Sequence, residues 1–203
     1  MSSSTIRAGQ LAGAVVGLAA VAAVMAPAAV GASKFGAKLT GVQPVGASPA
    51  HNCIPVAGGC TRVGVNYAAT SAVGANAAAA ENGKVKRIRV VAATPGNFRL
   101  FLAKVQSFDL ATGTGQAKVK RKGPRIFYEG NGFTSKPIEH FETRVKVRKG
   151  EYLAIKSRKT SALDCTPATV NQLVFQPPLG RGGGFVSADA FDRCQLLVQA
   201  VVK

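Results

Sequence analysis

Apolar and polar residues alternate in short runs from about residue 61 to the C-terminal end of the chain. Alternation with a period of two is typical of strands that bury one face, and the Gly, Pro and Asn residues between the runs are typical of turns. Residues 68–83 and the polar stretch 111–123 lack such alternation and are predicted to connect strands. Because no long helix is indicated, the pattern predicts an all-β fold, an antiparallel β-sandwich of the jelly-roll type. The strands predicted in this way cover residues 61–67, 84–93, 98–108, 125–130, 171–178 and 194–202.

The clearest alternation lies in residues 141–157 and predicts a β-hairpin. A three-residue loop, 149–151, would set Val147 opposite Leu153, so that the apolar side chains of both arms share one face. Gly150 would take the position in the loop that requires a positive φ. The outward face of this hairpin would carry cations and form an anion-binding surface. Its predicted residues are Arg144, Lys146, Arg148 and Lys156.

The first part of the chain has the composition of an export signal. An uncharged stretch rich in Ala, Val, Leu and Gly, residues 11–31, ends in small residues, which predicts a signal peptide over residues 1–32. The alternative is an uncleaved anchor, because about 20 apolar residues can cross a bilayer. Residues 33–52 are predicted to be a flexible leader, and 53–203 the β-sandwich domain. We therefore expect a secreted or envelope-associated protein that meets the membrane only through the signal segment before cleavage.

The four cysteines all follow the predicted signal peptide. An even number of cysteines in an exported domain is typical of disulfide bonds. The short segment between Cys53 and Cys60 contains Pro and Gly residues that allow the chain to turn back. We therefore predict the pairs Cys53–Cys60 and Cys165–Cys194, with a crossed pairing as the alternative. Neither pair has the spacing of a zinc site.

The chain is strongly basic, with 26 Lys and Arg against nine Asp and Glu. Cleavage after residue 32 would remove one arginine and no acid, leaving a net charge of +16. Such a charge favours anionic partners, among them polymers or sugars of the cell envelope, although it also serves solubility. The chain has no Trp and three Tyr. This scarcity of stacking residues disfavours specific nucleic-acid recognition and weakens a carbohydrate-binding interpretation.

Few residues indicate catalysis, and no cofactor is expected. The two histidines, His51 and His140, stand at no metal or nucleophile spacing, and no G-x-S-x-G, H-E-x-x-H or P-loop motif occurs. The glycine-rich segment Gly180–Gly184 is predicted to be a flexible connector. As an alternative, its backbone amides and Arg181 could hold an anion, although phosphate loops normally precede a helix.

Two carboxylate groupings complete the candidate chemistry. Asp164, Asp189 and Asp192 could contribute oxygen ligands to calcium if the pair Cys165–Cys194 brings them together, but calcium takes six to eight oxygens. An acid pair for glycoside hydrolysis is formally available and has weak support. Its members would be Glu129 with Glu139 or Glu142.

The pattern V-x-V-x-x-G-E-x-L-x-I at residues 145–155, the dipeptide Asp164-Cys165 and the final Q-A-V-V-K resemble a group of exported bacterial proteins. The resemblance implies a jelly-roll or galactose-binding-like sandwich and export, and it supplies no activity or functional residue. The leading hypothesis is therefore a non-enzymatic binding or structural domain that contacts anionic polymers. A carbohydrate-binding module, with or without calcium, and a carboxylate-dependent hydrolase are the alternatives.

Overall fold

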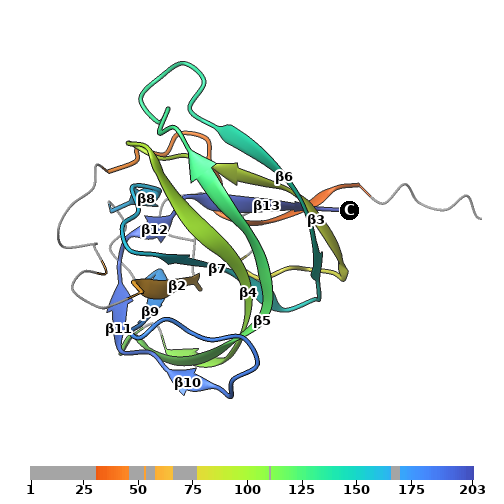
Figure 1. The fold of residues 1–203 in the computed structure, drawn as a ribbon, viewed down its shortest axis with the longest axis vertical. Helices are drawn as coiled ribbons and strands as arrows, with labels where there is room; N and C mark the ends of the chain where they lie inside the picture. Colours follow the sequence, from red (N-terminus) through yellow and green to blue (C-terminus); the bar gives the residue numbers. More distant parts are fainter. Residues whose placement is uncertain (1–30, 46–52, 54–57, 66–76, 110, 166–169) are drawn as a thin grey trace, which may run out of the picture.

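The computed structural model describes residues 31–45, 53, 58–65, 77–109, 111–165 and 170–203. Within these residues the chain forms β-strands and no helix, and the strands pair in antiparallel fashion (Figure 1). The predicted all-β, antiparallel class is confirmed. The strands are β1 (Ser33–Gly36), β2 (Cys60–Gly64), β3 (Gly83–Val90), β4 (Gly96–Asp109), β5 (Thr114–Tyr128), β6 (Glu139–Val147), β7 (Glu151–Ser157), β8 (Leu163–Asp164), β9 (Gln172–Phe175), β10 (Val186–Ser187), β11 (Ala190–Asp192), β12 (Gln195–Leu196) and β13 (Val198–Val202).

A four-stranded sheet has the order β1-β13-β3-β6. Its strand β3 shows how the sequence pattern sets the faces, since Val85, Ile88 and Val90 are buried while Lys84 and Lys86 are exposed. A register shift between Val85 and Arg87 adjusts the alternation along the strand. Residues 198–202 of the apolar C-terminal run lie in this sheet as β13, between β1 and β3.

A seven-stranded sheet has the order β10-β5-β4-β7-β2-β9-β11, and β8 and β12 form a separate pair. The long strands β4 and β5 curl across the molecule (Figure 1). The middle of β4 is buried on both faces, because Leu100 and Leu102 belong to the main core while Phe101 and Ala103 belong to a second cluster. This explains why the sequence there reads as a nearly continuous apolar run.

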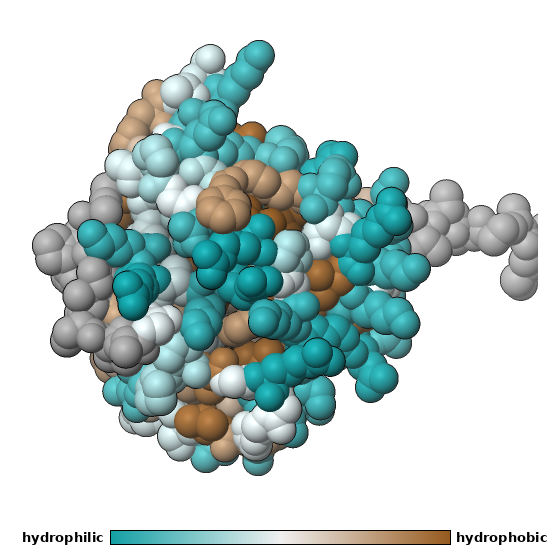
Figure 2. Space-filling model, viewed as in Figure 1, coloured by the Kyte–Doolittle hydropathy of each residue, from teal (hydrophilic) through white to brown (hydrophobic). Residues whose placement is uncertain are grey.

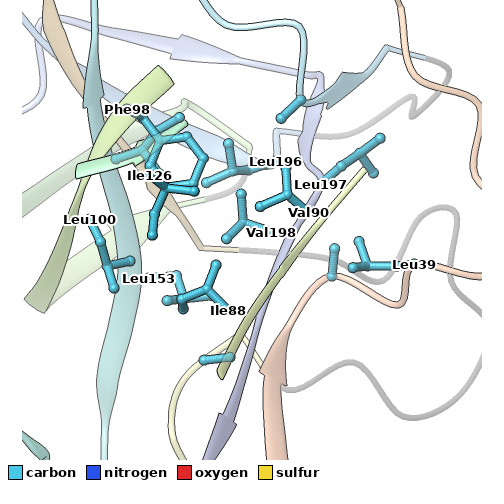
Figure 3. Close-up of a cluster of buried hydrophobic side chains, with 14 of the residues drawn as sticks. Leu39, Ile88, Val90, Phe98, Leu100, Ile126, Leu153, Leu196, Leu197 and Val198 are labelled. Carbon is cyan, nitrogen blue, oxygen red and sulfur yellow. The ribbon is translucent and has the colours of Figure 1, made fainter. Parts of the chain in front are cut away.

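The main core consists of buried side chains from both larger sheets. Figure 3 shows apolar side chains that both sheets contribute to it: Phe98, Leu100, Ile126 and Leu153 from the seven-stranded sheet, and Ile88, Val90 and Val198 from the four-stranded sheet. Burial of each large side chain stabilises the fold by about 1.5–3 kcal/mol. The second cluster lies on the other face of the seven-stranded sheet, where Ala154 pairs with Phe101 and with Val63.

The predicted hairpin over residues 141–157 is wrong. Strand β6 pairs with β3 in one sheet, whereas β7 pairs with β4 and β2 in the other, so both edges of β7 are occupied. Residue Ala79 also forms backbone hydrogen bonds with Gly150 and Glu151, where the hairpin would have closed. The apolar positions of the two strands still face one core, but they reach it from different sheets. Gly150 does have the predicted positive φ, 77°.

Parts of two segments that were not predicted as strands, the polar stretch 111–123 and the leader 33–52, form strands. Residues 114–123 of the polar stretch form the first part of β5, which pairs with β4 along its length. In the predicted leader, β1 pairs with β13, and Phe35, Ala37 and Leu39 are buried in the main core. The β-fold therefore includes residues before Cys53. Residues 46–52 of that leader and residues 1–30 of the predicted signal peptide lie outside the described residues.

Both predicted disulfide pairs are present. Cys53 bonds with Cys60, with 5.4 Å between their Cα atoms, and Cys165 bonds with Cys194. Disulfides of this kind persist in oxidising compartments. The first bond lies at the start of β2, and the second ties the end of β8 to the start of β12.

Candidate anion-binding cleft

An open cleft of about 1120 Å³ lies over the ends of β4, β5 and β7. Among the described residues that line it, none is an Asp or Glu. The face on which β4 and β5 lie nearest the viewer carries many hydrophilic residues (Figure 2). The cleft therefore concentrates one sign of charge in a concave site. Its cationic side chains are Arg99, Lys122, Arg125, Lys156, Arg158, Lys159 and Arg181.

The floor of the cleft contains a row of three cations that the strand register sets side by side. Arg99 of β4 is the direct partner of Arg125 on β5 and of Lys156 on β7. Directly opposed residues of adjacent strands share a face and lie close together. Like charges in such a position destabilise a sheet. The guanidinium of Arg99 donates a hydrogen bond to the backbone carbonyl of Gly123, at 3.3 Å, rather than to an acid.

One wall consists of the segments 94–97 and 157–161, which hydrogen bonds join. The hydroxyl of Ser161 donates to the carbonyl of Thr94, at 2.7 Å, and accepts from the Thr94 amide, at 3.2 Å. The amide of Cys53 donates to the carbonyl of Arg158, so the first disulfide is attached to the same wall. Ser157 is 7% exposed, and its hydroxyl has no hydrogen-bond partner within the described structure.

The opposite wall comes from the segment that precedes the glycine-rich run. The amide of Leu179 donates to the Thr61 hydroxyl, at 3.0 Å, and Arg181 forms a parallel bridge with Val119 of β5. The contact of Leu179 with Thr61 and the bridge of Arg181 with Val119 therefore hold this segment at the cleft. Gly182–Gly184 remain exposed. Gly180 and Arg181, in the segment predicted to be a flexible connector, line the cleft. No helix follows this segment, so it is not a phosphate loop.

The predicted anion-binding surface is divided between two places. Lys156 lies in the cleft, whereas Lys146 and Arg148 line a second hollow of about 600 Å³ at the edge of the four-stranded sheet. Arg144 is exposed on β6 and lines neither. The division follows from the fold, because β6 and β7 lie in different sheets.

The predicted carboxylate sites do not form as expected. Asp192 forms a buried ion pair with Arg62, at 2.6 Å, and Asp189 accepts a hydrogen bond from the Gln176 amide. Asp164 is also buried, at 3% exposure. Across the part of the chain that the structure describes, no three His, Cys, Asp or Glu side chains are grouped to hold a metal.

The acids proposed for hydrolysis have structural partners. The carboxylate of Glu139 accepts hydrogen bonds from the backbone amides of Glu129, Gly130 and Asn131, and thus anchors a loop. Glu142 forms an exposed ion pair with Arg87, at 2.8 Å.

Of the two histidines, the structure describes His140, which does not line the cleft. His140 is exposed on β6, and burial together with the charges of Arg89 and Arg87 lowers its pKa, against the opposing effect of Glu142. His51 falls outside the described residues.

Comparisons with protein-family models, with curated proteins and with solved structures gave no match to this chain. In the described part of the structure, no helix has the length and apolar character needed to cross a membrane.

Proposed function

We propose that this protein is a non-enzymatic domain that binds anionic polymers, and that the cleft over β4, β5 and β7 is its binding site. The observation that carries the proposal is the row Arg125–Arg99–Lys156, in which three cations are directly opposed on adjacent strands. Like charges in this arrangement lower the stability of the free protein. An anion bound over the row would relieve that repulsion, which gives the arrangement a function in binding.

The rest of the cleft supports the same proposal. Four of its seven cations are arginines, whose planar guanidinium groups match the oxygens of phosphate and carboxylate. The aromatic residues of the lining, Phe101 and Tyr128, are only 5% and 4% exposed. They offer little surface for stacking bases or sugar rings, so recognition through charge is favoured over specific nucleic-acid or carbohydrate recognition.

The finer aspects of fold and location belong to this proposal as well. We propose that the two larger sheets form a jelly-roll-like sandwich, and that the protein is secreted or attached to the cell envelope. The shared core between the sheets and the two disulfide bonds support these statements. In that location, anionic polymers of the envelope or its surroundings are accessible partners.

Charge reversal in the cleft tests the proposal. We expect the double variant Arg125→Glu/Lys156→Glu to weaken binding to an immobilised polyanion by roughly tenfold or more, because charge-assisted contacts contribute about 1.5–3 kcal/mol each. The matched control, Lys38→Glu/Lys136→Glu, changes the net charge equally at exposed residues outside the cleft. Binding by the unaltered protein should also weaken as salt concentration rises.

Equal losses in the two double variants would refute a cleft-centred site and leave a general effect of net charge. A separate variant, Arg144→Glu, tests the surface predicted from the sequence. A large loss in this variant would place the site on β6 instead.

A further inference from the structure

The second hollow repeats the electrostatic arrangement of the cleft on a different sheet. Lys84 of β3 is the direct partner of Lys146 on β6, so two more cations lie opposite each other. No Asp or Glu occurs among the described residues that line this hollow. Its cationic side chains are Lys84, Lys86, Lys146, Arg148 and Lys203, together with Arg121, whose guanidinium forms an ion pair with the buried Glu151 of β7.

Strand β5 separates the two sites and contributes to both. Lys122 is the partner of Phe101 and lines the cleft, whereas Arg121 is the partner of Leu102 and lines the second hollow. These two neighbours therefore point to opposite faces of the strand, as successive residues of a strand do. The cleft reaches from Lys122 to Arg125, which spans about 10 Å along the strand.

Between the two sites, no strand of the described structure other than β4 pairs with β5. Strand β10 pairs with β5 only at Gln116 and Ala117, and Arg181 bridges to it at Val119. From residue 120 onward, β4 is the one strand that pairs with β5 among the described residues. Lys120 is exposed at the beginning of this stretch of β5. A ligand can thus pass from one site to the other over a strand edge that itself carries positive charge.

We infer that the ligand is a linear polymer with phosphate groups along its backbone, and that it crosses the edge of β5 to occupy the cleft and the second hollow together. This inference rests on the proposed function of the cleft. A small anion reaches one site, whereas a flexible chain reaches both, and the second contact then forms at a high effective concentration. Arginine binds phosphate oxygens through paired hydrogen bonds, and a phosphate chain carries this charge at every unit along its backbone. With few exposed rings in either lining, the chain is recognised through its charges.

Inorganic polyphosphate of graded length is the probe. We expect long chains to bind the unaltered protein roughly a hundredfold more tightly than tripolyphosphate, since two linked contacts add avidity. The variant Lys84→Glu/Lys146→Glu should abolish most of this length advantage and leave tripolyphosphate binding at the cleft unchanged within about twofold. The neutral variant Lys84→Gln/Lys146→Gln should reduce the advantage in part, and the control Lys38→Glu/Lys136→Glu should retain it. Thermal unfolding of each variant verifies that it is folded.

The possible failures are distinguishable. If long chains remain sensitive to Arg125→Glu/Lys156→Glu but not to changes at Lys84 and Lys146, the two-site inference is wrong and the cleft proposal stands. If neither pair of substitutions weakens the binding of any polyphosphate, both the two-site inference and the cleft proposal are wrong. Binding of a sulfated oligosaccharide with no binding of polyphosphate would also overturn the assignment of a phosphate chain. A mixed-sequence oligonucleotide that binds like polyphosphate of equal charge would support recognition of the phosphate backbone.

Discussion

The floor of the cleft and the outer surface of β6 both carry several cations, but their neighbours differ. On the β6 side, Arg87 forms an ion pair with Glu142, and Arg89 donates a hydrogen bond to Gln199 at 2.6 Å. In the cleft, Arg99 is flanked by two further cations, and the described lining contains no acid. Clusters that look alike in the sequence thus have opposite environments. Around Arg87 and Glu142, the β6 side is a solvated surface with partial neutralisation, whereas the floor of the cleft gathers uncompensated charge in a concave site.

The two regions also differ in how firmly they are held. The cleft wall is attached to the Cys53–Cys60 disulfide through the hydrogen bond from Cys53 to Arg158, and hydroxyl contacts of Ser161 join its two segments. The exposed pair Arg87–Glu142 is a surface contact of the kind that contributes about 0–1 kcal/mol. A fixed wall keeps the repelling cations of the floor at the positions where a ligand meets them.

Loss of the first disulfide should have the largest effect and should act on the cleft. We expect Cys53→Ser/Cys60→Ser to lower the free energy of unfolding by about 2–4 kcal/mol, because the unfolded chain is no longer constrained. The affinity of the cleft for polyphosphate should fall as well, since the wall at Arg158 loses its support. Unfolding by denaturant and a binding titration measure the two effects.

The double variant Cys165→Ser/Cys194→Ser is the matched control, because it removes a disulfide from β8 and β12, and neither of its cysteines lines the cleft. A similar loss of affinity in both variants would show that the Cys53–Cys60 bond has no special relation to the cleft.

Local patterns predicted most of the strands because burial of one face demands alternation. Strand β3 is an example, since its buried and exposed residues follow the sequence closely. Alternation does not say which strand lies next to which. Val147 of β6 and Leu153 of β7 pack into one core from two different sheets. The hairpin prediction therefore had the right buried faces but the wrong strand partners.

The site was only partly predictable for the same reason. Lys156 was identified as a cation on an alternating strand, but its neighbours Arg99 and Arg125 come from strands far away in the sequence. Arg99 is a single charged residue within an apolar run, which is a signal that could have marked it. Arg181 reaches the cleft because contacts of Leu179 and Val119 place its segment there, and no local pattern encodes those contacts.

Neutralising one cation in each region should change stability in opposite directions. We expect Arg125→Gln to raise the free energy of unfolding by about 0.2–1 kcal/mol, because it removes a like charge directly opposite Arg99. On β3, Arg87→Gln should lower it by a few tenths of a kcal/mol or leave it unchanged, since it removes an exposed ion pair with Glu142. Thermal unfolding at low and high salt measures both, and the gain from Arg125→Gln should shrink as salt screens the repulsion. Destabilisation by Arg125→Gln would mean that the cleft cations do not repel one another significantly.

The smallest expected effect is a dependence of the free energy of unfolding on pH. Of the two regions compared, we expect it from the β6 side and not from the cleft. Burial and the charges of Arg89 and Arg87 lower the pKa of His140 in the folded protein below the ordinary value of 6.5. The unfolded chain therefore binds a proton more readily than the folded one, and stability falls as pH decreases through 6.5, levelling off below the folded pKa. In the variant His140→Gln this contribution should vanish, which melting temperatures measured above and below that pH would reveal.

None of the described residues that line the cleft is a histidine, so the affinity of the variant for polyphosphate should equal that of the unaltered protein at each pH. An unchanged pH dependence of stability in His140→Gln would assign it to another group, and a changed affinity would link the two regions.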